Sequence, residues 1–181
     1  IEYRVEFDPC FEEICFQGVP DIRIIVFKGV PVMAMLRLPT RMSGGKANLH
    51  QGAVGVGVDI ASGVTMGGVW RHETVHEHPD TGQSIRGVAI PHWQTMLTIA
   101  ARGYELTHLG YLGVDLVLDR HKGPLLLELN ARPGLAIQIA NQAGLMPRIE
   151  LIEKNYRDMA PGERMAFAQQ HFGNDAQVKP G

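Results

Sequence analysis

The chain has 181 residues, of which 45% are hydrophobic and 20% are charged, the balance of an ordinary soluble globular protein. Its formal net charge of −2 gives no electrostatic reason to expect nucleic acid or a membrane surface as a partner. No apolar run approaches the roughly 20 residues that cross a bilayer. Ile1 has neither a signal peptide nor an initiator methionine before it, so we expect a piece of a longer protein. The only cysteines, Cys10 and Cys15, are too few for a disulfide scaffold, which favours a cytoplasmic location.

The predicted elements, in chain order, are strand pairs followed by helices. Alternating or apolar runs bounded by turn residues predict strands at residues 2–7, 22–27, 32–38, 54–60, 64–70, 114–118 and 125–129. Helical spacing of apolar residues predicts an amphipathic helix at residues 93–109, and residues 135–142, 147–158 and 162–171 look like further short helices. Residues 39–53 are expected to form a polar loop, and residues 174–181 a flexible tail. Three hairpins followed by helices predict an α+β fold, in which an antiparallel sheet of hairpins is flanked by helices.

The third hairpin carries acidic side chains on a strand that otherwise looks buried. Glu128 and Asn130 lie two positions apart, and in a strand that spacing places both on the same face. If residues 120–123 form the loop and Asp119 pairs with Pro124, Asp115 lies directly opposite Glu128, with Cβ atoms about 4.5–5.5 Å apart. Such a pair of like charges is explained by a cation between them, and oxygen ligands suit Mg²⁺ or Mn²⁺. The alternative is a solvated strand face on which Glu128 pairs with an arginine.

The residues after this strand favour an anionic ligand beside the cation. Arg132 precedes a proline, which favours an extended backbone at Arg132. It is therefore the next residue after Asn130 on the same face of the chain. Its guanidinium could bind phosphate or carboxylate in a bidentate manner. A helix starting near Leu135 would present free backbone N–H groups close by. Together these features indicate a site for Mg²⁺ and a polyphosphate.

Three stretches of the sequence resemble one known superfamily. Residues 113–135, GVDLVLDRHKGPLLLELNARPGL, resemble the end of an ATP-grasp domain, in which Asp…Glu-x-Asn holds the magnesium ions of ATP. Residues 21–37, DIRIIVFKGVPVMAMLR, and 45–53, GKANLHQGA, resemble the Asp-x-Arg hairpin and the Asn-Leu-x-x-Gly-Gly loop of amino-acid ligases. The similarity is greatest to the alpha-L-glutamate ligase-like proteins, which are related to the ribosomal-protein glutamate ligases. It covers most of residues 1–150, which would form the C-terminal lobe of an ATP-grasp fold, with its hinge strand at 1–7 and C-terminal helices at 151–173.

The resemblance also implies roles for individual residues. The metal ligands, for Mg²⁺ or Mn²⁺, would be Asp115, Glu128 and Asn130. The residues facing the phosphates or an acyl-phosphate intermediate would be Arg23 and Arg37, with Asn48 in the loop that closes over them. Arg132, indicated above as an anion ligand by its own position, completes the predicted catalytic set. The residues contacting the nucleotide would be Lys46 in the loop and Glu2, Tyr3, Val5 and Glu6 in the hinge. Several positions depart from the related ligases: Lys46 replaces an arginine, Ala53 a glycine and Arg132 a serine.

The implied function is an ATP- and Mg²⁺-dependent carboxylate–amine ligase of the amino-acid or glutamate type. It would form ADP through an acyl-phosphate intermediate and use ATP, a small carboxylate and an amine as substrates. A missing N-terminal lobe of the same protein would precede residue 1, and we expect the present lobe to be inactive alone. Two alternatives are a nucleotide-binding module without ligase turnover and a Mg²⁺-dependent phosphohydrolase.

Overall fold

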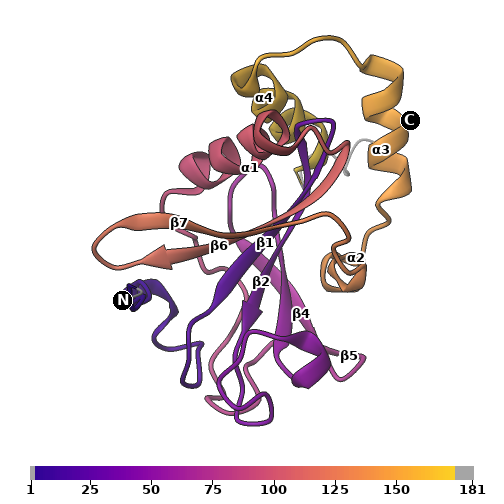
Figure 1. The fold of residues 1–181 in the computed structure, drawn as a ribbon. Coiled ribbons are helices and arrows are strands. Elements are labelled where there is room, and N and C mark those ends of the chain that lie inside the picture. Colours follow the sequence, from indigo (N-terminus) through magenta and orange to yellow (C-terminus); the bar gives the residue numbers. More distant parts are fainter. Residues whose placement is uncertain (1–2, 174–181) are drawn as a thin grey trace.

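The computed structural model describes residues 3–173 as an α+β domain built on one seven-stranded antiparallel sheet (Figure 1). The strands, in the spatial order β5-β4-β3-β2-β1-β6-β7, are β1 (Asp21–Phe27), β2 (Val30–Leu38), β3 (Val54–Val58), β4 (Thr65–Trp70), β5 (Glu73–Val75), β6 (Tyr111–Asp119) and β7 (Gly123–Asn130). The helices are α1 (Trp93–Thr107), α2 (Ala136–Asn141), α3 (Met146–Asn155) and α4 (Pro161–Phe172), with short 3-10 turns η1 (Pro9–Phe11) and η2 (Leu49–Gln51). The predicted fold class is therefore confirmed. None of the helices in the described range is long and apolar enough to cross a membrane.

The two faces of the sheet are covered by different helices. One face is wholly apolar at its centre, where Ile24 pairs with Val114 and both are fully buried. Helix α1 packs here because Gly103 lacks a side chain: a Cβ at Gly103 would lie 2.9 Å from a methyl carbon of Leu112. On the opposite face α2 packs over Gly57, where an added Cβ would lie 2.5 Å from a helix carbonyl oxygen. This second face also carries the charged residues of β1, β2 and β6.

The first hairpin turns earlier than predicted. Its turn is residues 28–29, both with positive φ, rather than residues 28–31. A two-residue turn of this kind matches the twist of the paired strands. Val26 pairs with Pro31 and Ile25 with Met33, so Val32 is an extra residue that forms a bulge. Beyond this bulge the register places Asp21 opposite Arg37.

The third hairpin also contains a β-bulge. Asp119 pairs with Gly123, so the predicted pair of Asp119 with Pro124 is wrong by one residue. The register then shifts beyond Leu116, and Leu127 is the extra residue on β7. As a result Asp115 lies directly opposite Glu128, which confirms the predicted pairing at the position that matters for the site.

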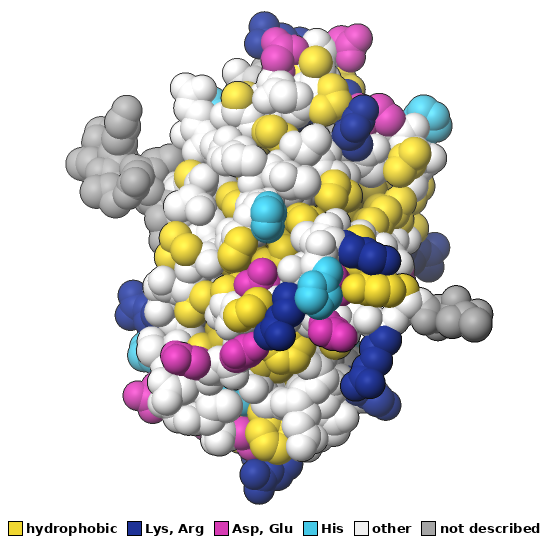
Figure 2. All heavy atoms as spheres, turned by 90° about the vertical axis from the view of Figure 1, so that its left-hand side faces the viewer, with side chains coloured by type: hydrophobic (Ala, Val, Ile, Leu, Met, Phe, Trp, Pro, Cys, Tyr) yellow, Lys and Arg dark blue, Asp and Glu magenta, His cyan; other side chains and the backbone are white. Residues whose placement is uncertain are grey.

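The N-terminal strand that the sequence predicted is not formed within the described residues. Tyr3–Glu6 has no regular secondary structure, and Phe7 makes a single antiparallel bridge to Asp119. Figure 1 places this segment beside the tip of the β6–β7 hairpin, and Figure 2 shows the same side of the molecule. Glu2, predicted in the hinge, and the tail at 174–181 lie outside the described residues. The other predicted boundaries differ by a few residues, and β5 was not predicted.

Candidate active site

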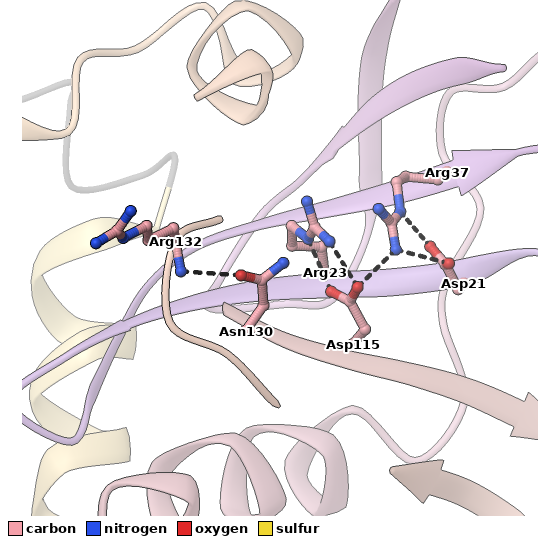
Figure 3. Close-up of polar contacts among 6 residues, drawn as sticks. All are labelled: Asp21, Arg23, Arg37, Asp115, Asn130 and Arg132. Atoms are coloured by element: carbon pink, nitrogen blue, oxygen red, sulfur yellow. Dashed lines mark hydrogen bonds and ion pairs between the residues drawn. The ribbon is translucent and has the colours of Figure 1, made fainter. Parts of the chain in front are cut away.

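A row of buried charges crosses three strands on the face opposite α1 (Figure 3). Arg23 of β1 donates two hydrogen bonds to Asp115 of β6, from Nε at 2.7 Å and from Nη2 at 2.6 Å. Arg37 of β2 donates to the same carboxylate from Nη2 at 2.8 Å. The Asp115 side chain is only 5% exposed, and those of Arg23 and Arg37 are 13% and 12% exposed. Charges this deeply buried require partners, and here each charge has one.

Asp21 extends the row and is a residue that the sequence interpretation missed. It accepts two hydrogen bonds from Arg37, from Nε at 2.5 Å and from Nη2 at 2.7 Å. The order along the sheet is thus Asp21, Arg37, Asp115, Arg23, with the signs of charge alternating. Asp21 opens the Asp-x-Arg motif, so the motif was visible; its partnership with Arg37 depended on the bulge in the first hairpin.

The pKa values within the row identify where a proton would bind. Burial raises the pKa of Asp21 to about 6, although the hydrogen bonds and charge of Arg37 oppose that rise. Burial acts to lower the pKa of Arg37, but Asp21 and Asp115 outweigh it and the net direction is upward. Arg37 therefore stays charged, and on acidification the proton goes to Asp21.

A pH-dependent contribution to stability follows from the Asp21 shift. Its pKa in the folded protein, about 6, exceeds the ordinary value of 3.8, so folding takes up a proton between these two pH values. The free energy of unfolding should therefore fall as pH rises from about 4 to 6, by roughly 3 kcal/mol from this group. Urea unfolding of the wild type and Asp21→Asn across this range measures the effect, which should be absent from the variant. Parallel pH profiles would contradict the prediction.

Glu128 and Asn130 lie beside this row on β7, at the edge of the sheet. Glu128 is exposed and, within residues 3–173, accepts no hydrogen bond and forms no ion pair. The Oδ1 atom of Asn130 accepts a hydrogen bond from the backbone N–H of Arg132 at 2.9 Å, which leaves this oxygen a second lone pair. The exposed Arg132 side chain has no ion-pair partner among the described residues.

The oxygen atoms of Asp115, Glu128 and Asn130 can be compared with what Mg²⁺ or Mn²⁺ would require. Asp115 has about four acceptor positions, and the arginines occupy three, so one position on Oδ1 remains. Among residues 3–173, no three His, Cys, Asp or Glu side chains form a metal-binding group. Mg²⁺ prefers oxygen ligands, and Glu128 and Asn130 offer carboxylate and amide oxygens on the face of the sheet that carries Asp115. Asp115 was predicted primarily as a metal ligand; in this structure it mainly holds two arginines.

The loop between β2 and β3 carries the predicted residues Lys46 and Asn48. The Asn48 side chain accepts a hydrogen bond from the backbone N–H of His50 at 3.0 Å and so caps η2. Lys46 is exposed. The loop lies over the sheet next to Arg37, because a Cβ on Gly55, which pairs with Arg37, would lie 2.9 Å from a Leu49 methyl carbon. Within the described range, no hydrogen bond or ion pair joins Lys46 or Asn48 to the charged row.

The predicted hinge residues contact the tip of the β6–β7 hairpin instead of the row. The Tyr3 hydroxyl and the Glu6 backbone N–H donate to Asp119, at 3.1 Å and 3.0 Å. The Glu6 carbonyl accepts from the backbone N–H of Arg120 at 2.7 Å. The main chain of Glu6 is therefore already bonded, and Val5 is half-buried beside it.

Comparison with known proteins places this arrangement in a family. The structure of the ATP-grasp ligase PsnB, complexed with a phosphomimetic variant of minimal precursor, Mg and ADP, is 13% identical with a TM-score of 0.37. That match covers 83% of this chain and 34% of the PsnB chain, so the chain spans about a third of that protein's length. The comparison with curated proteins gave no significant match. The family described as sugar-transfer associated ATP-grasp matches residues 1–154. Because this match extends over most of the sequence, the chain belongs to the sugar-transfer associated ATP-grasp family.

Proposed function

We propose that this chain is the C-terminal lobe of an ADP-forming, ATP- and Mg²⁺-dependent carboxylate–amine ligase. The family match supports the use of ATP. The observation that carries the proposal is the buried row of alternating carboxylates and arginines with Glu128 and Asn130 beside it. Strand register places these groups on one face, since Arg23 pairs with Asp115 and Asp115 with Glu128. Arginines held in place by carboxylates, next to side-chain oxygens of Glu128 and Asn130 that could bind a cation, suit a site for phosphoryl transfer.

The arginines keep hydrogen-bond donors available for a ligand. A guanidinium carries five N–H donors. Arg23 uses Nε and Nη2 on Asp115, and Arg37 uses Nε and Nη2 on its two carboxylates. The Nη1 atoms of Arg23 and Arg37 make no hydrogen bond within residues 3–173, so their N–H groups are available to a ligand. Because the carboxylates hold each guanidinium in place, these donors are preorganised to stabilise negative charge on a transferred phosphoryl group or an acyl phosphate.

Glu128 and Asn130 would hold Mg²⁺ or Mn²⁺ on the same face. Such an ion, when bound, neutralises charge on phosphate oxygens. Glu128 suits this role because it is charged, exposed and without a partner in residues 3–173. Asn130 is fixed by its bond to the Arg132 backbone, so its oxygen keeps one orientation. Arg132 itself, at the end of the strand, would meet the carboxylate or the acyl phosphate.

The substrate class is proposed from two sources that differ in detail. The family is described as sugar-transfer associated, which favours a substrate connected with sugar transfer. The motifs at residues 21–37 and 45–53 instead resemble glutamate ligase-like proteins. In both cases a small carboxylate and an amine would enter beside the loop that carries Lys46 and Asn48. An N-terminal lobe would complete the nucleotide site, so this lobe alone would be inactive.

The decisive experiment is to measure ADP release by the full-length protein, with ATP, Mg²⁺ and panels of carboxylates and amines. A ligase should release ADP only when both an acceptable carboxylate and an amine are present, because the acyl phosphate must be consumed for turnover. ADP release without an amine requirement, accompanied by inorganic phosphate, would indicate a phosphohydrolase. ATP binding without ADP release across the panels would indicate a binding module.

A further inference from the structure

The loop at residues 39–53, which joins β2 to β3, is closed at its base. The Thr40 hydroxyl donates to the Gly52 carbonyl oxygen at 2.8 Å, and the indole N–H of Trp70 donates to the same oxygen at 2.9 Å. These bonds bring the two ends of the loop together. The orientation of residues 41–51 relative to the sheet depends on contacts with other segments of the chain.

One of these segments is the tight turn at residues 76–85, which follows β5. The backbone N–H of Ile85 donates to the His76 carbonyl at 2.9 Å, and Ile85 is fully buried, so the turn is anchored in the core. His78, within this turn, is only 1% exposed. Its Nε2 atom lies 2.9 Å from the carbonyl oxygen of Pro39, at the start of the loop.

The hydrogen bonds of His78 determine which ring nitrogen carries the proton. The backbone N–H of Asp80 donates to Nδ1 at 3.2 Å, and because a backbone N–H can only donate, Nδ1 is unprotonated. Nε2 therefore carries the hydrogen and donates it to the Pro39 carbonyl. Burial lowers the pKa of His78, although the Pro39 carbonyl and the charge of Asp80 oppose that change, so the ring is neutral at pH 7. With both nitrogens bonded, the ring has one orientation.

Asp80 joins the same turn to the loop by a second bond. Its Oδ2 atom accepts a hydrogen bond from the backbone N–H of Arg41 at 2.7 Å. Pro39 and Arg41 lie just beyond Arg37, the last member of the charged row on β2. His78 and Asp80 therefore hold the main chain at the point where it leaves the row and enters the loop.

The other side of the loop is also in close contact with the body of the domain. Gly18 has a φ of +75°, and a Cβ on this residue would lie only 1.8 Å from the Gly45 carbonyl oxygen. The Arg41 guanidinium lies 5.1 Å from the centre of the Phe16 ring. The loop is thus enclosed between residues 16–18 and the 76–85 turn, and loss of the His78 bonds would release one of these two sides.

We propose that His78 is a positioning residue for the loop at residues 39–53. It fixes the orientation in which Lys46 and Asn48 of this loop meet the phosphate groups of the substrate. This inference rests on the proposed function, and it gives a role in turnover to a buried side chain that touches no substrate. A displacement of about 1 Å at a reacting group can cost roughly a hundredfold in rate, so a tilted loop should slow the reaction.

The test measures ADP release by the full-length protein with ATP, Mg²⁺ and the carboxylate and amine that give turnover. His78→Phe keeps a buried ring but removes both hydrogen bonds, and we expect kcat/KM for ATP to fall by about tenfold or more. His78→Gln can again donate to the Pro39 carbonyl and should recover most of this loss. A purely structural role would leave kcat/KM unchanged in assays below the unfolding midpoint of every variant.

Two further substitutions in the same turn complete the set. Asp80→Ala removes the bond to the Arg41 N–H from an exposed residue, so kcat/KM should fall while the thermal unfolding midpoint stays unchanged. Glu77→Ala is the matched control, because Glu77 is an exposed carboxylate whose side chain makes no hydrogen bond or ion pair within residues 3–173. Its kcat/KM should equal that of the wild type.

A second measurement needs no substrate. Hydrogen exchange of the amides of residues 41–52 should accelerate in His78→Phe and Asp80→Ala, and remain unchanged in Glu77→Ala. Unchanged exchange in the first two variants, or faster exchange with normal kcat/KM, would overturn the inference and leave the proposed function intact. A wild-type protein that releases no ADP with any substrate would contradict both. If His78→Phe does not fold, Asp80→Ala decides the question by the same comparison.

Discussion

Glu128→Gln in the full-length protein is expected to reduce ADP formation by about a hundredfold or more while leaving the thermal unfolding midpoint unchanged. Glutamine preserves the shape of the side chain but removes the charge that would hold a divalent cation. Glu128 is exposed and has no partner in the described part of the chain, so the fold does not depend on that charge. Coupled-enzyme detection of ADP across a range of Mg²⁺ concentrations measures the effect. Mn²⁺ binding followed by electron paramagnetic resonance gives a readout independent of turnover.

The sheet offers a matched control for this substitution. Glu73 is also an exposed glutamate on an edge strand, but β5 is the edge opposite β7. Glu73→Gln should therefore leave both ADP formation and Mn²⁺ affinity unchanged. Full turnover and normal Mn²⁺ affinity in Glu128→Gln would remove Glu128 from the metal site.

Asp115→Asn is expected to destabilise the folded protein by about 3–5 kcal/mol, in contrast to Glu128→Gln. Asp115 is the shared acceptor of Arg23 and Arg37, and all three side chains are largely buried. Without its charge the two guanidinium groups keep only Asp21 as an ionised partner. Urea unfolding at pH 7 measures the loss of free energy, provided that the denaturant dependence is the same in both proteins.

Two further variants test whether the loss of stability in Asp115→Asn comes from its buried ion pairs or from the change in net charge. Glu12 pairs with Arg120 at the surface, where the side chains are 55% and 42% exposed, so Glu12→Gln should change stability by less than about 1 kcal/mol. The double variant Arg23→Met/Asp115→Leu should lose less than the sum of its single variants, because an apolar pair leaves fewer buried charges unpaired. A loss in Asp115→Asn no larger than that in Glu12→Gln would show that the row contributes little to stability.

Several features of this protein were determined by the sequence alone. Apolar runs bounded by turn residues predicted β1, β2, β3, β4, β6 and β7, and α2–α4 were also expected from the sequence. The i, i+3, i+4 spacing predicted α1, because that pattern depends only on which side chains share a face. The same rule placed Glu128 and Asn130 together. The three motifs indicated the ATP-grasp superfamily, which the family match supports.

The tertiary structure decided how the charges are used. Bulges at Val32 and Leu127 set which residues pair, and an extra residue in a strand reverses the face of everything beyond it. Asp21 therefore meets Arg37, a contact that residue spacing could not predict without knowledge of the bulge.

Contacts between residues far apart in the sequence decided the partners of Asp115 and of the N-terminal segment. Asp115 binds arginines more than it could bind a metal, because three strands bring their charges into one buried row where each must be paired. The N-terminal segment, although it alternates like a strand, is held by Asp119, more than a hundred residues away, in place of a neighbouring strand. Alternation records which side chains face inward; only the folded chain decides which donors and acceptors are left to bind a ligand.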